Sequence, residues 1–381
     1  MNLLVYEHVS GGGFAGTSIP EDILCEGFAM LRTLTHDLRA MGHRITLPID
    51  LRLKPLAALL RAERIIPVKS KRMLLKTLRE AAHSLEAAYI IAPEGILPSL
   101  IEAVEEAGVL SLNCTPDAIR AAADKAKAQR VLAKAGLNVP ETVEAYVDES
   151  PSALKLKAKE LGFPVVFKPP CGVSCAGLSL VKGEGQIPAA IKRVKHETGS
   201  KRFLIQKFIR GVHASVSLIA TAQKATPLTL NRQWVRLEAP SGVSSYEGGV
   251  VPLEHPLKNE AFRAAEKALS LFNGLRGYVG VDLVLTWDKA YVMEINPRLT
   301  TSYVGLRRVL EYNPAQAIVD AAVHGVAPGK GQTTGFAAFQ KLETSNLSPG
   351  ILDGVCSMEG GVTPPMGMPS YAFIEAYGLT L

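Results

Sequence analysis

The sequence has little of what marks secreted, membrane-bound or disordered proteins. Its 381 residues include five cysteines, an odd and scattered set that excludes a disulfide framework and favours free thiols in a reducing compartment. No apolar run approaches the roughly 18 residues that span a bilayer, because charged side chains interrupt every run. No basic segment precedes the short apolar run at the start of the chain, so we expect a cytoplasmic protein without a signal peptide.

A strong excess of one charge is also missing. Lys and Arg number 42 against 36 Asp and Glu, and this net charge of +6 does not by itself indicate nucleic-acid binding. Hydrophobic residues make up 47% of the chain, which at this length predicts two or three folded domains. Residues 51–79 are locally basic, with Glu63 as their single acid. Such a segment is typical of a solvated helical face, and a binding patch is the second interpretation.

Apolar periodicity predicts an α/β unit in the first part of the chain. A strand at residues 3–6 leads into a glycine-rich loop, and apolar side chains then recur every three or four residues from 24 to 41, as in an amphipathic helix. Two more buried strands are predicted at residues 88–92 and 109–112. Residues 1–112 therefore form a predicted parallel-sheet domain, whose ligands would bind beyond the carboxyl ends of the strands.

The rest of the chain predicts an α+β region. Thr115, Pro116 and Asp117 are typical of a helix start, and we expect one helix from there to about Ala135. Strand patterns then dominate, apart from a helical period at residues 262–272. We expect domains at residues 1–112, 113–202 and 203–381. The predicted strands are residues 164–168, 178–181, 203–208, 214–220, 278–285 and 291–295.

Two strand segments near the C-terminal end carry the strongest chemical signal. Side chains alternate along a strand, so Glu294 and Asn296 share a face, and a turn at residues 287–289 would set Asp282 opposite Glu294. Two carboxylates and an amide form a good site for a hard cation such as Mg²⁺. The alternative interpretation is a solvated hairpin face.

A second signal is Lys168 at the end of an apolar strand, followed by a loop of small residues. Glycines such as Gly172 and Gly177 let backbone N–H groups approach phosphate oxygens, while the lysine supplies a point charge. Cys171 and Cys175 belong to this loop, but no matching Cys or His cluster follows, which favours a phosphate loop over a thiolate metal site.

A third signal is the strand at residues 204–209, which leaves through Gly211 and enters another strand near His213. A connection of this kind between two lobes can offer backbone groups to the edge of an adenine ring.

The order of these signals along the chain resembles the ATP-grasp superfamily, from the N-terminal unit to about Val326. The resemblance implies an N-terminal α/β domain and two α+β lobes that enclose ATP, with two Mg²⁺ or Mn²⁺ ions on its phosphates. It also implies a carboxylate–amine ligase that forms an acyl phosphate and then an amide, in a superfamily where homodimers are frequent.

The same resemblance assigns roles to individual residues. Gln206 and His213 stand where glutamates commonly bind the adenine amino group and the ribose, so both remain expected nucleotide contacts. The remaining assignments are Lys125 and Lys168 to phosphate, Gly172, Ser174 and Gly177 to the covering flap, Lys207 and Ile209 to adenine through their backbones, Asp282, Glu294 and Asn296 to metal, and Arg298 to the acyl phosphate.

A narrower resemblance is to the tyramine–glutamate ligases of methanofuran and methylofuran biosynthesis. It rests on residues 4–8 with the following glycine loop, and on Glu26, Gly27 and Met30. It implies that the γ-carboxylate of L-glutamate is joined to tyramine or a related aromatic amine such as tyrosine. Arg232 and Arg298 would then bind substrate carboxylates.

Several alternatives stay open from the sequence. Tyr246 is a candidate for the aromatic slot, and His8, His213 and His255 are candidates for the catalytic base. A different amide ligase of the same fold is the second enzyme interpretation. A nucleotide-responsive protein that contacts nucleic acid through the basic segment is the third, although the metal-ligand pattern argues against it. The sequence predicts no role for residues 329–381.

Overall fold

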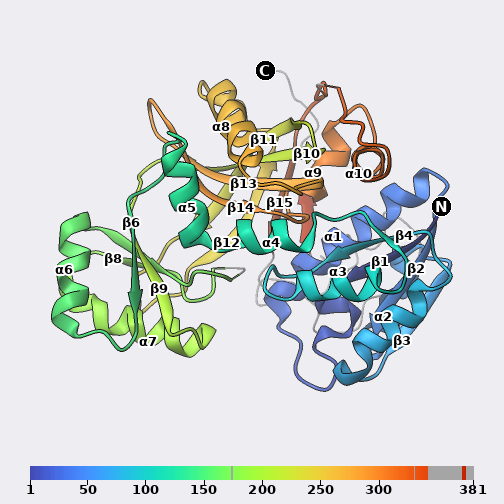
Figure 1. The fold of residues 1–381 in the computed structure, drawn as a ribbon, viewed down its shortest axis with the longest axis horizontal. Helices are drawn as coiled ribbons and strands as arrows, with labels where there is room; N and C mark the ends of the chain where they lie inside the picture. The colour runs from blue at the N-terminus through green and yellow to red at the C-terminus, as the bar shows by residue number, and fades with distance from the viewer. Residues whose placement is uncertain (173–174, 330, 342–370, 375–381) are drawn as a thin grey trace.

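The computed structural model describes residues 1–172, 175–329, 331–341 and 371–374, and Figure 1 shows them arranged around three β-sheets. The five-stranded sheet lies in the N-terminal unit, the four-stranded sheet lies at the opposite side of the view, and the seven-stranded sheet lies between and above them. No helix among the described residues is both long enough and apolar enough to span a membrane.

The N-terminal unit is a parallel sheet with the strand order β3-β2-β1-β4-β5. The central strands β1 and β4 are almost wholly buried, as expected for strands covered on both faces. This confirms the parallel-sheet prediction, to which the structure adds β2 and β3. The elements are β1 (Asn2–Glu7), the short helix η1 (Val9–Gly13), α1 (Glu21–Ala40), β2 (Arg44–Asp50), the 3₁₀ helix η2 (Leu51–Leu60), β3 (Arg64–Val68), the short helix η3 (Lys71–Met73), α2 (Leu74–Ala82), β4 (Ala87–Ile91), α3 (Leu97–Glu105) and β5 (Leu110–Ser111).

The strand order reverses between β1 and β4. The chain leaves β1 toward one side and returns to β4 from the other, so a crevice forms beyond the carboxyl ends of these two strands. Glu7 and Val9 after β1, together with residues 91–93 after β4, line the main cavity of the protein. The expected location of the ligand in this unit therefore agrees with the structure.

The four-stranded antiparallel sheet has the order β6-β9-β7-β8 and packs against α6 and α7. Ser150 caps the start of α6, and Gly162 ends that helix in a backbone conformation with a φ of 77°. Phe167 and Phe203 stack in its core with ring centroids 5.3 Å apart. The elements are β6 (Thr142–Tyr146), α6 (Pro151–Leu161), β7 (Val165–Lys168), β8 (Ser179–Val181), the short helix η4 (Glu184–Gln186), α7 (Ile187–Thr198) and β9 (Arg202–Lys207).

The seven-stranded antiparallel sheet has the order β14-β13-β10-β11-β12-β15-β16. One face carries apolar side chains and packs against α8. The six strands predicted beyond residue 160 are all present, whereas β6, β11, β12, β15 and β16 were not predicted. The elements are β10 (Val212–Ala220), β11 (Ala225–Arg236), β12 (Ser245–Val251), α8 (Lys258–Ser270), β13 (Gly277–Leu285), β14 (Ala290–Asn296), α9 (Tyr303–Val309), α10 (Pro314–Val323), β15 (Ala337–Lys341) and β16 (Tyr371–Ile374).

The single helix expected from Thr115 to Ala135 is in fact two helices, α4 (Pro116–Ala123) and α5 (Lys125–Lys134). Asp124 breaks the run with an extended backbone, and its carboxylate accepts a hydrogen bond from the N–H of Lys127 at the start of α5. Alanines on both sides of this residue favour a continuous helix, which explains the wrong prediction. The break makes Lys125 the first residue of α5.

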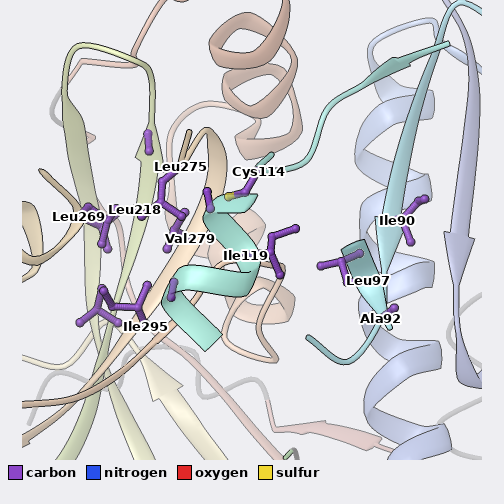
Figure 2. Close-up of a cluster of buried hydrophobic side chains, with 14 of the residues drawn as sticks. Ile90, Ala92, Leu97, Cys114, Ile119, Leu218, Leu269, Leu275, Val279 and Ile295 are labelled. Carbon is purple, nitrogen blue, oxygen red and sulfur yellow. The ribbon is translucent and has the colours of Figure 1, made fainter. Parts of the chain in front are cut away.

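Helix α4 connects the N-terminal unit to the seven-stranded sheet. Figure 2 shows Ile119 pointing toward Leu97 on one side of α4, while Val279 and Ile295 of the sheet lie on its other side. Since α4 and α5 pack on β14 and β9 completes the four-stranded sheet, we propose a lobe boundary at residues 208–211 in place of 202.

Candidate functional site

A cavity of about 300 Å³ lies where the three sheets meet. Its walls come from β7 and β9 of the four-stranded sheet, from β11 to β14 of the seven-stranded sheet, and from α1 and the ends of β1 and β4 in the N-terminal unit. Most of the predicted site residues line it. They are Lys125, Lys168, Gly172, Gln206, Lys207, Ile209, His213, Asp282, Glu294, Asn296 and Arg298, together with the substrate candidate Tyr246.

The predicted carboxylate pair is assembled by β13 and β14. Asp282 pairs directly with Glu294 across the two strands, and Gly280 pairs with Asn296. The Asn296 amide donates a hydrogen bond to Asp282 Oδ2 at 3.1 Å, and Gln233 of β11 donates to Oδ1 at 3.0 Å. The expected hairpin register is therefore confirmed, and Gln233 is an additional member of the group.

Two lysines face this pair from different elements. The Lys125 ammonium at the start of α5 lies 3.2 Å from Glu294 Oε2, and Lys168 at the end of β7 is buried. Burial lowers the pKa of Lys168 to about 8, with Glu294 opposing the shift and Lys125 adding to it. Burial alone would also lower the pKa of Lys125, but Glu294 and Glu94 outweigh it and raise that pKa above its ordinary value.

The two carboxylates respond in opposite directions. Burial and the neighbouring Glu294 raise the pKa of Asp282. Burial would also raise the pKa of Glu294, but the two lysines hold it below its ordinary value. One side of the pair is therefore neutralised by protein cations, while Asp282 lies in a negative environment that favours an additional cation.

The connection between the two antiparallel sheets contributes the second part of the cavity. Gln206 is buried on β9, and its amide donates a hydrogen bond to the Thr142 hydroxyl at 2.8 Å. The backbone N–H groups of Lys207 and Phe208 donate to the carbonyls of Glu141 and Pro164. Ile209 follows at the cavity wall, so its amide is available where the strand has ended. Burial, with a contribution from Arg232, lowers the pKa of His213 on β10 and keeps that side chain neutral.

The third part of the cavity is formed with the N-terminal unit. Arg298 Nε lies 2.7 Å from Glu94 Oε1, and its Nη1 donates to the Leu299 carbonyl at 3.0 Å. This ion pair joins the loop after β4 to the segment after β14. Glu7, whose carboxylate accepts hydrogen bonds from Val9 and Ser10, closes the cavity beside it.

Some predicted residues are not brought to the cavity. Arg232 lies between Asn231 and Gln233 on β11, and because those neighbours face the polar side of the sheet, Arg232 points to the opposite side. Arg232 is not among the residues that line the cavity, and its binding of substrate stays a prediction. The Gly177 N–H donates to Glu197 at 2.7 Å, and Gly177 does not line the cavity although Ala176 and Leu178 beside it do. Ser174 lies outside the described residues.

The other histidine candidates and the basic segment also lie elsewhere. His8 contacts the Tyr6 hydroxyl, and burial lowers its pKa to about 4, while His255 accepts a hydrogen bond from the Leu257 N–H. Neither lines the cavity, and neither does any residue of the basic segment 51–79. His213 is the one of the three histidines that does.

Sequence reasoning assigned no site role to several residues that the structure brings here. The cavity is lined by Gln233 of β11, by Glu26 and Met30 of α1 and by residues 300–302 after β14, and Glu94 contacts the lining residue Arg298. The available signal on α1 was a helical face with one acid among apolar side chains. The contact of Gln233 with Asp282 was not predicted, because the strand of Gln233 was not predicted.

Comparisons with known proteins agree with this architecture. Residues 122–302 match the ATP-grasp domain, and residues 43–119 match the pre ATP-grasp 3 domain. The chain is an ATP-grasp domain protein. Its ATP-grasp domain contains β6 to β14 and every residue of the lysine and carboxylate group.

Two relatives and one solved structure illustrate the similarity. The tyramine–L-glutamate ligase of Methanocaldococcus jannaschii is 31% identical over 64% of this chain and 66% of its own length. The D-alanine–D-alanine ligase of Desulforudis audaxviator is 29% identical over 63% of this chain and 80% of its own length. The crystal structure of an ATP-grasp superfamily protein from Archaeoglobus fulgidus has a TM-score of 0.69 at 22% identity, over 99% of this chain and 100% of that chain.

ATP-grasp enzymes bind ATP with Mg²⁺, and the donor set of the cavity fits such an ion. Two carboxylates and the Asn296 amide are hard oxygen donors. Among the described residues, no group of three or more His, Cys, Asp or Glu side chains forms a complete metal cage. The protein would therefore supply part of an octahedral shell, and phosphate and water would complete it, as Mg²⁺ prefers.

Proposed function

We propose that this protein is an ATP-dependent ligase that joins the γ-carboxylate of L-glutamate to tyramine or a related aromatic amine. The substrate carboxylate would attack the γ-phosphate of ATP, giving an acyl phosphate and ADP. The amine nitrogen would then attack the acyl carbon, and phosphate would leave as the amide forms. The similarity to the tyramine–L-glutamate ligase supports this choice of substrates.

The observation that carries the proposal is the convergence of Lys125, Lys168, Asp282 and Glu294 on one cavity. The transferred phosphoryl group is anionic, so its transfer requires positioning and neutralisation of charge more than covalent help from the protein. Lys125 and Lys168 would hold phosphate oxygens. Asp282, Glu294 and Asn296 would hold Mg²⁺, which when bound neutralises developing charge on the phosphates.

The connection between the sheets would bind the base and ribose of the nucleotide. The carbonyl of Lys207 and the amide of Ile209 are suited to the two polar atoms on the edge of adenine. Gln206 has its amide nitrogen engaged by Thr142, which leaves its carbonyl oxygen to accept from the adenine amino group. His213 would face the ribose.

Arg298 would act on the carboxylate side of the reaction. Its guanidinium is a planar donor suited to a carboxylate or an acyl phosphate. Glu94 holds the guanidinium in place before an anion arrives, and a substrate anion would compete with Glu94 for it. The wall formed by residues 300–302 would keep water from the acyl phosphate, which would otherwise hydrolyse.

The test is ADP release from ATP and Mg²⁺ or Mn²⁺ with L-glutamate, in the presence and absence of tyramine or tyrosine. Mass spectrometry of the products identifies the amide. ADP release that requires both substrates, together with a γ-glutamyl amide, is the expected result. If ATP binds but no pair of this type supports turnover, the substrate assignment is wrong.

A second candidate is a ligase of the same kind for another pair of amino acids. The match to the D-alanine–D-alanine ligase over 80% of that enzyme's length favours it as the main alternative. Its product would be a dipeptide, so the same mass spectrometry with D-alanine or a mixture of amino acids separates the two. A nucleic-acid-binding role for residues 51–79 remains a hypothesis, which salt-dependent binding to RNA or DNA would support.

A further inference from the structure

One face of α1 forms a wall of the cavity. Ile23, Glu26, Gly27 and Met30 all line the cavity, and their spacing of three, one and three residues places them on a single side of the helix. Glu26 is the charged member of this group. A carboxylate therefore lies on an otherwise apolar wall, in the part of the site that the phosphate-binding residues do not use.

Three observations describe part of the surroundings of Glu26. The Thr301 hydroxyl donates a hydrogen bond to Glu26 Oε2 at 3.4 Å. Burial raises the pKa of Tyr246 well above its ordinary value, and the charges of Glu26 and Asp282 raise it further. Burial raises the pKa of Cys175 to about 12, with contributions from Glu26, Glu294 and Asp282. The charges of both Glu26 and Asp282 thus act on Tyr246 and Cys175.

This arrangement makes the potential around Tyr246 negative. Of the groups named as acting on Tyr246, Glu26 and Asp282 are carboxyl groups, whereas Tyr278 and Cys175 stay protonated because burial raises their pKa to about 12. The cavity cations contact or face other acids: Lys125 contacts Glu294, Lys207 contacts Glu141, Arg298 contacts Glu94, and Lys168 lies near Glu294 and Asp282. A ligand at this end is therefore favoured when it carries a positive charge, and a second carboxylate there would be repelled.

The apolar part of the wall indicates which chemical group a positively charged ligand would carry beside its charge. Val9 after β1, Ile91 at the end of β4, and Ile23 and Met30 of α1 line the same end, with the ring of Tyr246 facing them from β12. These side chains offer a surface for an aromatic or aliphatic body, with Glu26 at its edge.

We propose that Glu26 is the residue that recognises the amine substrate, by binding its ammonium group while Ile23 and Met30 contact its apolar body. The inference rests on the proposed ligase function and deepens it. It also distinguishes the two amines left open above. Tyramine presents an ammonium group alone, whereas tyrosine adds a carboxylate on the neighbouring carbon that would lie in the negative field around Tyr246. The structure therefore favours an amine without an α-carboxylate.

Binding measurements test this without requiring turnover. Tyramine, tyrosine and p-cresol are titrated calorimetrically into the full chain saturated with a non-hydrolysable ATP analogue and Mg²⁺. We expect the unaltered protein to bind tyramine roughly tenfold or more tightly than either of the other two. The variant Glu26→Gln should lose roughly 10- to 100-fold in tyramine affinity, because it removes a charged hydrogen-bond acceptor of nearly identical shape.

Three comparisons keep the result specific to the ammonium group. Affinity of Glu26→Gln for the ATP analogue and for p-cresol should stay within about twofold of the unaltered protein, because neither ligand uses the charge. Glu26→Asp should retain part of the tyramine affinity. Glu80→Gln, which alters an exposed carboxylate of α2 paired with Lys76, should change nothing.

The inference is overturned if Glu26→Gln binds tyramine as the unaltered protein does, if tyrosine binds better than tyramine, or if tyramine does not bind to the nucleotide-loaded protein. Failure of the ligase function has a different signature, namely no ADP release with any carboxylate and amine although tyramine binding depends on Glu26. Turnover with another amine that is indifferent to Glu26 would preserve the function and remove the inference.

Discussion

The two ends of the cavity are built in different ways. At the phosphate end, Lys125, Lys168, Asp282 and Glu294 come from separate elements and compensate one another's charge. At the α1 end, Glu26 lies among apolar side chains and a tyrosine ring, and the buried Glu7 packs behind Gly27. The first end is suited to an anion that brings its own metal ion, and the second to a small cation with an apolar body. The difference indicates that each end favours a ligand that supplies the missing charge: an anion with its metal ion at the phosphate end, and a cation at the α1 end.

The largest effect is expected from Glu294→Ala, which would break the phosphate end. The change removes a predicted metal ligand and leaves Lys125 and Lys168 without the carboxylate that both of them face. Turnover should fall by roughly 1,000-fold or more, measured as ADP release. Glu160→Ala, at an exposed position of α6, is the matched control. An active Glu294→Ala enzyme would contradict the assignment of the metal site.

Lys168→Ala should have the next largest effect, now on nucleotide binding. Loss of a buried point charge on phosphate is expected to weaken the binding of an ATP analogue by roughly 10- to 100-fold in calorimetry. Binding of tyramine to the α1 end should change much less. Equal losses for both ligands would mean that the two ends are not separate.

The same lysine predicts how binding depends on pH. Its pKa in the free protein is lowered to about 8, so it is charged at pH 7 and loses its proton as the pH rises through that value. The affinity for the ATP analogue should therefore fall between pH 7 and pH 9. Lys168→Arg, which stays charged, should flatten this decline. A decline that is unchanged in the arginine variant would assign it to another group.

Gly27→Ala tests the packing behind the α1 end. A Cβ atom at this position would lie 2.5 Å from Glu7 Oε1, and Glu7 is held in place by Val9 and Ser10. The helix would have to move from β1, at an expected cost of about 1–3 kcal/mol in unfolding free energy. Chemical denaturation measures this cost. Gly42→Ala, where an added Cβ meets no neighbouring atom but φ is 78°, measures backbone strain without crowding, whereas Gly27 has a helical backbone and tests crowding alone.

The smallest effect is expected nearer the C-terminal end of the same helix, at Asp37. Burial raises the pKa of Asp37 to about 6, although the Tyr303 hydroxyl and Arg307 favour its charged form. Because the folded state then binds more protons than the unfolded state, the unfolding free energy should fall as the pH rises from about 4 to 6. Asp37→Asn should remove this dependence and raise stability at pH 7 by about 1 kcal/mol. A pH dependence that persists in the variant would place its origin elsewhere.

Sequence patterns identified the phosphate end and the strands that carry it. Charged residues such as Asp282 and Glu294 stand out inside apolar strands, and a short turn fixes their register, so their meeting could be predicted. Lys125 was expected at the cavity, where the structure places it, but it was expected in the middle of one long helix and not at the start of a second one. Its position depends on Asp124, whose capping side chain competes with a run of alanines that favours helix.

The α1 end could not be predicted in the same way. Its residues lie far apart in the sequence, from Val9 to Thr301. They meet because the strand order reverses between β1 and β4, and because α1 packs beside the segment that follows β14. Arg232 is the opposite case, a residue that was expected at the cavity and that the structure does not bring there. Its residue type suited a substrate carboxylate, but the strand was not predicted, so its side of the sheet was unknown.

In the ion pair between Arg298 and Glu94, the Glu94 carboxylate competes with any other anion for Arg298. Any anion that takes Arg298 must displace a carboxylate that is already 2.7 Å away and largely shielded from solvent. Chloride or free phosphate gains little from such an exchange, whereas a substrate carboxylate fixed by further contacts gains more. Competition with Glu94 would therefore lower the affinity of Arg298 for small anions more than for a substrate that makes further contacts, while Glu94 holds the arginine in position.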